Sequence, residues 1–352
     1  MILKMPIYCK SFRCIADKCT DNCCVGWEID IDSASADYYK SIKGAFGDKL
    51  RKNIADGEVC SFILKGERCP FLNEKNLCEI IISLGEDKLC QICRDHPRFF
   101  EWYSDIKEGG IGLCCEEAAR IIVTNTEPFA TYDTPCGDEG CDDYDAQLYD
   151  MLLFARDEII STLENEKLPL GERFALVIDY ACQIQHMADN YQYEKLPLSS
   201  HRPTEKASPK IKAFLEAFAS LEPIDENWTA YLKELTESAD TLSEKAASAD
   251  TEFDLYLKNI AVYFIWRYFL KGVYDEEIFS KVMLSAVCTA MIKLMFIKEK
   301  SAGKTLTGKH CSILAKNLSK EIEYSSENLE KIYDMVYDNP TFAKENLPAI
   351  IS

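Results

Sequence analysis

The residues of this chain that could do metal or redox chemistry are its cysteines, and they are distributed unevenly. Of the 17 cysteines, twelve lie at or before Cys115, and only three lie beyond Cys141. Thiolates bind zinc and iron–sulfur clusters, and a dense cysteine set in a chain without an export signal favours metal binding over disulfides. The first part of the chain therefore predicts a cysteine-ligated metal module.

The spacing of the cysteines up to residue 93 indicates the candidate ligands. Cys90 and Cys93 have the spacing of a turn that presents two thiolates to one ion, and Cys19 and Cys23 could share one face of a helix. Neither pair supplies the four ligands of a tetrahedral zinc or [4Fe-4S] site, so we expect distant pairs to converge. The predicted metal ligands come from the set Cys14, Cys19, Cys23, Cys24, Cys69, Cys78, Cys90 and Cys93.

Several further side chains leave alternatives open. The isolated cysteines favour the reading of buried free thiols, because cysteine packs as a small hydrophobe. The paired cysteines after residue 93 could be second-site ligands, redox partners or buried thiols, and His96 could complete a mixed site or be structural. The isolated residues are Cys60, Cys182, Cys288 and Cys311, and the undecided cysteines are Cys114, Cys115, Cys136 and Cys141.

The cysteine-rich segments resemble a known group of proteins. The run from Phe12 to Cys24, Cys69-Pro-Phe-Leu with Leu77-Cys78, and residues 89–98 look like the cysteine-cluster proteins that include the flagellin lysine-N-methylases. This resemblance is specific over residues 8–120, and the aromatic tract 263–274 is similar to the C-terminal part of the same methylases. It implies protein lysine N-methylation with S-adenosylmethionine, a flagellin-like substrate, and zinc or a [4Fe-4S] cluster on the cysteines.

The residues themselves say little about methyl transfer. No strand followed by a glycine-rich turn and a distant acid marks a Rossmann cofactor site, and Gly109-Gly110-Ile-Gly112 favours a tight turn. After Cys19-x3-Cys23, the position where a CxxxCxxC motif needs its third cysteine is Gly26. Radical chemistry would therefore need cluster ligands from separate segments.

A lysine methylase also has to neutralise its substrate. The amine has a solution pKa near 10.4, so a desolvating wall and a proton-accepting carboxylate or phenol are required. The stretch Phe99-Phe100-Glu101-Trp102-Tyr103 offers both, although packed aromatic core around the metal site is the favoured reading. The sequence assigns no catalytic residue and no S-adenosylmethionine site.

The charge balance limits the classes of partner. The chain has 40 Lys and Arg against 59 Asp and Glu, a net charge of −19, which works against binding nucleic acid or anionic membranes. An acidic surface suits a lysine-rich protein partner, although simple solvation explains it too. Lysines and arginines interrupt the most apolar stretches, and the first residues lack the apolar run of a signal peptide. We therefore expect a cytoplasmic protein.

Apolar spacing predicts a mainly α-helical fold with few short strands. Residues 148–163, 174–184 and 211–221 carry helical stripes, and the tracts 253–272 and 277–299 are apolar nearly all round, as in central helices. Strand patterns are confined to residues 27–32 and, more weakly, 121–124. We expect a metal-binding module over residues 1–144 packed on a bundle-like helical domain over 145–352, with an internal break near 194–209.

Three functions of different classes fit these observations. The first is protein lysine N-methylation, which depends on S-adenosylmethionine. The second is a zinc-stabilised interaction module that needs no cosubstrate. The third is thiol redox exchange through the later cysteines, which would survive metal removal.

Overall fold

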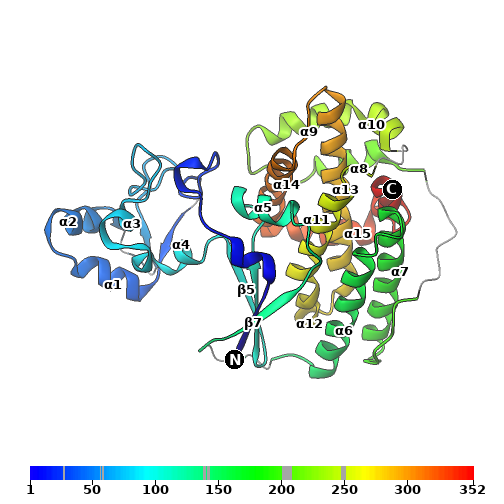
Figure 1. The fold of residues 1–352 in the computed structure, drawn as a ribbon, viewed down its shortest axis with the longest axis horizontal. Helices are drawn as coiled ribbons and strands as arrows, with labels where there is room; N and C mark the ends of the chain where they lie inside the picture. Colours follow the sequence, from blue (N-terminus) through cyan, green and yellow to red (C-terminus); the bar gives the residue numbers. More distant parts are fainter. Residues whose placement is uncertain are drawn as a thin grey trace.

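Helices dominate the structure, a computed structural model that describes residues 1–26, 28–55, 57, 59–137, 140, 143–199, 208–246 and 251–352. The prediction of a mainly α fold is confirmed, and the strands of the described residues form two small sheets. Figure 1 shows a large helical part and, beside it, a smaller part that carries α1 to α4. We call residues 29–95 the lobe, and residues 1–12 with 98–352 the body.

The first strand ties the beginning of the chain into the body. Four strands form a sheet in the order β5-β6-β1-β7. Strands β5 and β6 form a hairpin, whereas β1 runs parallel to β6 with Ile2 opposite Ile106, and antiparallel to β7. A parallel pair needs a long crossover, which here includes the lobe. The strands are β1 (Ile2–Pro6), β5 (Arg98–Tyr103), β6 (Ile106–Ile111) and β7 (Thr131–Pro135).

The helices of the body surround α13. The predicted amphipathic stripes are observed as α6, α7 and α8, and the two apolar tracts as α11 and α13. Helix α6 begins after Asp145, whose carboxylate accepts hydrogen bonds from the amides of Gln147 and Leu148. The helices are α5 (Glu116–Val123), α6 (Ala146–Leu163), α7 (Leu170–Asp189), α8 (Ile211–Phe218), α9 (Trp228–Glu237), α10 (Ala239–Ala246), α11 (Asp254–Tyr268), α12 (Gly272–Asp275), α13 (Ile278–Ser301), α14 (Gly308–Glu323), α15 (Ser326–Asp338) and α16 (Asn346–Ile351).

Helix α13 lies at the centre of the body's core. By length and composition it could cross a membrane, and among the described helices it alone could, but 94% of its most apolar window is buried inside the protein. It packs against α7, α11 and α16. An all-round apolar helix is typical of the centre of a helical domain, which confirms that prediction for 277–299.

The lobe has its own hydrophobic core. Tyr39, Leu50, Phe62 and Phe71 are almost fully buried there, and this cluster is separate from the body's core. A three-stranded sheet in the order β2-β4-β3 supports it. The lobe's elements are β2 (Asp30–Ile31), α1 (Ser33–Ser41), α2 (Gly44–Lys52), β3 (Ile54–Ala55), β4 (Cys60–Phe62), α3 (Glu79–Leu84) and α4 (Gln91–Asp95). Short 3-10 turns occur in the lobe at Glu86–Lys88 and elsewhere in the chain at Ile7–Ser11, Ala16–Lys18, Phe269–Lys271 and Pro340–Phe342.

Local expectations fail where tertiary packing overrides sequence pattern. Gly109 and Gly110 lie within strand β6 and not in a tight turn, because the rings of Phe99 and Phe100 occupy the space of their side chains. A Cβ on Gly110 would lie 2.7 Å from Cε1 of Phe99. Residues 121–123 belong to helix α5 and not to a strand, because α5 packs its apolar face against α11 and α14.

The remaining structural expectations concern a strand, a helical turn and the domain boundaries. The predicted strand 27–32 is observed only as Asp30–Ile31, and Trp27 lies outside the described residues. Cys19 and Cys23 do not share a helix, since the 3-10 turn Ala16–Lys18 ends at Cys19 in an extended conformation. The domain boundary at residue 144 and the break at 194–209 stay predictions, and residues 200–207 lie outside the described part of the chain.

Candidate functional site

Five cysteines of the predicted ligand set, from separate segments, pack on the core of the lobe, and Cys60 on β4 packs there as well. The backbone amide of Cys69 donates to the carbonyl of Cys24 at 2.9 Å, and Leu72 and Cys78 form a β-bridge. Cys90 precedes helix α4 and Cys93 lies in its first turn. Cys69 and Cys90 are buried, and the other three are half-buried. We call Cys24, Cys69, Cys78, Cys90 and Cys93 the lobe thiol cluster.

The side chains of this cluster interact electrostatically. The Cys93 thiol donates a hydrogen bond to the Cys90 sulfur, which lowers the pKa of Cys90 and raises that of Cys93. Burial raises the pKa of the Cys69 thiol to about 11 and that of Cys78 above its ordinary value, and neighbouring sulfurs add to both shifts. Crowded buried thiols of this kind favour the protonated form until a cation is present.

The donor type of the lobe thiol cluster suits zinc or iron, since sulfur is the ligand that both take in structural sites. The positions of these side chains, however, are not those of a site in which several ligands already surround one metal ion. Among the residues that the structure describes, no three His, Cys, Asp or Glu side chains lie close enough together to hold a metal ion. The ligand set predicted from the sequence therefore stays a prediction.

A second group of thiols lies where the first cysteine segment meets the body. Cys19 and Cys23 come from this segment, and Cys114 and Cys115 follow strand β6. The Cys23 thiol donates to Cys24, which raises the pKa of Cys23, and it receives a hydrogen bond from His96. Burial raises the pKa of the Cys115 thiol to about 12, and the nearby Cys114 and Cys23 sulfurs raise it as well. Cys14 is exposed.

Charged and polar contacts anchor the segment 19–24 on the body. The amide and hydroxyl of Thr20 donate to Glu116 at 2.7 and 2.6 Å. Asp21 accepts from Lys316 at 2.6 Å and from Lys320 at 2.9 Å, both on α14. The cysteine segment is thus held between α5 and α14, and α14 belongs to the C-terminal part of the chain.

A buried carboxylate that the sequence did not suggest lies behind this contact. Glu323 has only 1% of its side chain exposed and pairs with Arg267 at 3.0 Å. The hydroxyls of Tyr263 and Tyr268 donate to it at 2.9 and 2.8 Å, and Ser319 donates as well. Tyr263 also accepts a hydrogen bond from the amide of Leu113 at 3.1 Å, so the network fixes the backbone between β6 and Cys114. We call these groups the Glu323 network.

The aromatic stretch 99–103 forms strand β5 and is engaged structurally. The Phe99 ring lies 4.6 Å from the Arg267 guanidinium and edge-on to Tyr263. Glu101 pairs with Lys271, so its carboxylate is already committed to a cation. The structure thus supports the packed-core reading for Phe99. Cys136 is half-buried, and Cys141 lies outside the described residues.

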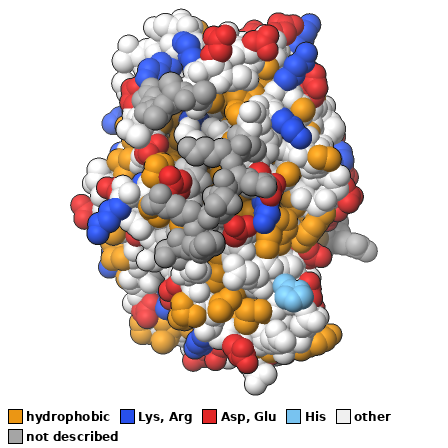
Figure 2. Space-filling view, turned by 90° about the vertical axis from the view of Figure 1, so that its right-hand side faces the viewer, with side chains coloured by type: hydrophobic (Ala, Val, Ile, Leu, Met, Phe, Trp, Pro, Cys, Tyr) orange, Lys and Arg blue, Asp and Glu red, His pale blue; other side chains and the backbone are white. Residues whose placement is uncertain are grey.

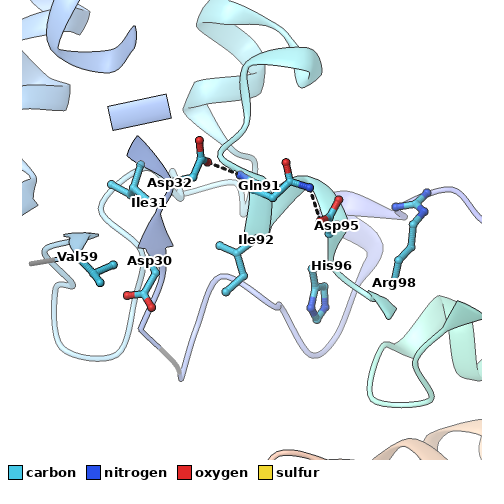
Figure 3. A pocket seen from close by; sticks show the side chains of 9 residues that line it. All are labelled: Asp30, Ile31, Asp32, Val59, Gln91, Ile92, Asp95, His96 and Arg98. Carbon is cyan, nitrogen blue, oxygen red and sulfur yellow. Dashed lines mark hydrogen bonds between the residues drawn. The ribbon is translucent and has the colours of Figure 1, made fainter. Parts of the chain in front are cut away.

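An open groove of about 540 Å³ runs along α4 on the lobe. In Figure 3, Ile92 projects from α4 and His96 from directly after it, and Asp30 projects from β2 toward the same side. His96 also contacts the Cys23 thiol, so the wall of the groove touches a cysteine segment. Ligand sites in proteins commonly span about 300–1,000 Å³. The lining residues are Asp30, Ile31, Asp32, Val59, Gln91, Ile92, Asp95, His96 and Arg98.

Comparison with known proteins connects the C-terminal part of the chain to a family. Residues 156–347, more than half of the chain, match the FliB lysine N-methylase C-terminal domain family. The chain belongs to this family. Tyr263, Arg267 and Glu323 lie in the matched segment, whereas the lobe thiol cluster lies before it.

Individual relatives share a shorter stretch. The flagellar biosynthetic protein FliU of Salmonella muenchen is 29% identical over 134 residues, which is 36% of this chain and 79% of FliU. Lysine-N-methylases of Salmonella typhimurium and Salmonella choleraesuis are 27% identical over 139 residues, 36% of this chain. The alignment spans only 33% of the length of these methylases. No solved structure matches the chain.

Proposed function

We propose that this protein is a protein-lysine N-methyltransferase that acts on a flagellin-like protein. The observation that carries the proposal is the match of residues 156–347 to the FliB lysine N-methylase C-terminal domain family. The relatives named lysine-N-methylase and flagellar biosynthetic protein point the same way. The net charge of −19 favours a substrate with a lysine-rich surface.

We propose S-adenosylmethionine as the methyl donor; when bound, it would supply an electrophilic methyl group. The lobe thiol cluster, with Cys14, Cys19 and Cys23, is the proposed source of ligands for a [4Fe-4S] cluster or zinc. Sulfur chemistry supports this assignment, and convergence of the thiols would be required on metal binding.

The groups that could take the proton of the substrate amine are limited. Glu323 already accepts hydrogen bonds from the hydroxyls of Tyr263 and Tyr268 and pairs with Arg267, so its carboxylate oxygens are engaged inside the protein. Glu101 is paired with Lys271. We therefore assign the Glu323 network a structural role and leave the proton acceptor unassigned.

A methyl-transfer assay tests the proposal. The full chain, purified without oxygen, is incubated with flagellin and radiolabelled S-adenosylmethionine, and methyl-lysine is measured by mass spectrometry. Label on flagellin lysines is the expected result, and it should disappear when S-adenosylmethionine is omitted. Absence of label with anaerobic, metal-replete protein would contradict the proposal.

Metal analysis of the same preparation tests the ligand assignment. Iron with sulfide and a brown absorption spectrum would support the cluster, and zinc at a fixed ratio without iron would indicate a zinc module. We expect Cys90→Ser to lower the bound metal strongly, whereas Cys182→Ser, at a half-buried thiol on α7, should leave it unchanged. Equal metal content in both variants would exclude Cys90 as a ligand.

A further inference from the structure

The groove along α4 has the chemistry of a lysine-binding site. A lysine side chain is an aliphatic stem that lies well on apolar surface, and it ends in an ammonium that needs a carboxylate. The groove offers Val59, which is 60% exposed, and Ile92 as apolar surface. Asp30, Asp32 and Asp95 supply carboxylates.

The three carboxylates differ in how far they are already engaged. Asp32 accepts hydrogen bonds from the amides of Ser35 at 2.9 Å and Gln91 at 2.8 Å, and it ties β2 to α4. Asp95 accepts from the side chain of Gln91. Within the described residues, the exposed Asp30 carboxylate has neither a hydrogen bond nor an ion pair. Asp30 is therefore the carboxylate that can receive a cation without breaking an existing contact.

The arginine among the lining residues lies away from Asp30. Arg98 is at the opposite end of the row of lining residues (Figure 3), and its guanidinium stacks 5.3 Å from the ring of Phe12. The groove is thus polarised, with a free carboxylate beside Val59 at one end and a guanidinium at the other. An ammonium group is attracted to the Asp30 end and repelled from the Arg98 end.

We propose that this groove binds a lysine-bearing segment of the protein substrate, with the ammonium at Asp30 and the stem on Val59 and Ile92. The inference rests on the proposed lysine methylation for the identity of the partner. Helix α4, which lines the groove, carries Cys93 and follows directly after Cys90, and the lining residue His96 contacts the Cys23 thiol. A lysine held there lies beside the cysteine segments that we propose as the cofactor site.

A peptide-binding experiment tests the groove separately from catalysis. The probe is a fluorescein-labelled heptapeptide with one central lysine flanked by alanines and serines, and the comparison peptide carries norleucine, which keeps the stem and lacks the charge. Binding to the full chain is measured by fluorescence anisotropy at low salt. We expect the lysine peptide to bind about 5- to 10-fold more tightly than the norleucine peptide.

Substitution of Asp30 locates the site. We expect Asp30→Asn to weaken binding of the lysine peptide about 5- to 10-fold and to leave the norleucine peptide unchanged. Asp37→Asn is the matched control, since Asp37 is an exposed carboxylate on α1 outside the groove and its loss changes the net charge equally. Equal affinities of the two variants for the lysine peptide would overturn the inference, as would equal binding of both peptides.

The methylation assay separates the two proposals. If the parent methylates flagellin and Asp30→Asn raises KM for the protein substrate while kcat is unchanged, the groove assignment is supported. If methylation by Asp30→Asn has the parent's KM, the groove assignment fails while the proposed function stands. If the lysine peptide binds in an Asp30-dependent manner but no methyl transfer occurs, the groove is a lysine site and the proposed activity is wrong.

Discussion

The Glu323 carboxylate shows how a single buried charge is held in this protein. Removing a carboxylate from water costs several kcal/mol unless a counter-charge and hydrogen-bond donors replace the lost hydration. Arg267 provides the counter-charge, and the hydroxyls of Tyr263 and Tyr268, on the same helix α11, provide the hydrogen-bond donors. The network holds together α11, α14 and the backbone that follows β6, so its loss affects three segments at once.

Substitution of Glu323 by glutamine should leave Arg267 without its counter-charge. Breaking a buried ion pair by removing one partner typically costs about 3–5 kcal/mol. We expect Glu323→Gln to lower the free energy of unfolding by about that amount, measured by urea denaturation. Glu330→Gln, at an exposed position of α15, should change it by less than about 0.5 kcal/mol. Similar stability of the two variants would show that Arg267 is adequately solvated without Glu323.

At the scale of elements, sequence pattern predicts helices well and small strands poorly. The helices α6, α7, α11 and α13 follow directly from apolar spacing, because packing and local preference agree there. The run 121–123 favours a strand locally, yet the amphipathic period of α5 and its contact with α14 decide its structure. The glycines of β6 look like a turn, because the Phe rings that fill their space come from a separate strand.

The candidate site could be predicted only in part, because some of its contacts join residues that lie far apart in the sequence. Cysteine spacing identified the residues of the lobe thiol cluster, since neighbouring thiols leave a signal in the sequence. Tyr263 and Glu323 are separated by 60 residues and come from two different helices. A tyrosine in an apolar helix looks like ordinary core and a glutamate at the end of an amphipathic helix like ordinary surface, so no pattern could indicate that they meet. The one available signal was the aromatic tract 263–274.

Strand β6 should tolerate no side chain at Gly110. A Cβ there would come within 2.7 Å of Cε1 of Phe99, whose ring is packed against Tyr263 and Arg267. We expect Gly110→Ala to destabilise the protein by about 1–3 kcal/mol, as overpacking does, measured as a shift in the urea midpoint. Gly137→Ala meets no atom within 4 Å and serves as the control with an unchanged midpoint. An equal midpoint for Gly110→Ala would mean that the Phe99 ring moves freely.

The anchor of the cysteine segment on α14 should depend on pH. Burial raises the pKa of Asp21, but hydrogen bonds and charge from Lys316 and Lys320 outweigh this and hold the pKa below its ordinary value. The stabilisation is therefore complete above the unfolded pKa of about 3.9 and is lost as the pH falls through the folded pKa. Asp21→Asn should cost about 1 kcal/mol at pH 7, and this difference should shrink below about pH 4.

Urea denaturation of Asp21→Asn and the parent at several pH values measures this difference. Asp48→Asn is a suitable control, because Asp48 forms an exposed ion pair with Arg51 within α2. Its effect should stay under about 0.5 kcal/mol at every pH. A constant difference between Asp21→Asn and the parent down to pH 3 would contradict the role assigned to the two lysines.

At the scale of the whole molecule, the thiols divide by burial. Cys14 is exposed, whereas Cys288 and Cys311 lie in the core of the body. Burial raises the pKa of the Cys311 thiol to about 12 and that of Cys288 well above its ordinary value. Reactivity depends on the accessible thiolate, so burial and a raised pKa both slow alkylation.

Alkylation by iodoacetamide followed by mass spectrometry should reproduce this order. We expect Cys14 to react first, and Cys288 and Cys311 to react only after the protein is unfolded in urea. If metal occupies the lobe thiol cluster, a chelator should speed the labelling of Cys78 and Cys93 and leave Cys288 protected. Labelling of Cys288 at the rate of Cys14 in the native protein would contradict the central position of α13.

The threading of the first strand has a consequence for fragments of this chain. Strand β1 lies between β6 and β7, whereas the lobe leaves the body after β1 and returns at β5. A protease cut after Lys65, at an exposed position of the lobe, therefore leaves both pieces joined by strand pairing and by the lobe's own core. The nicked protein should migrate as two bands under denaturing conditions and elute as one particle under native conditions. Two separately expressed fragments divided at this point should likewise reassemble when mixed.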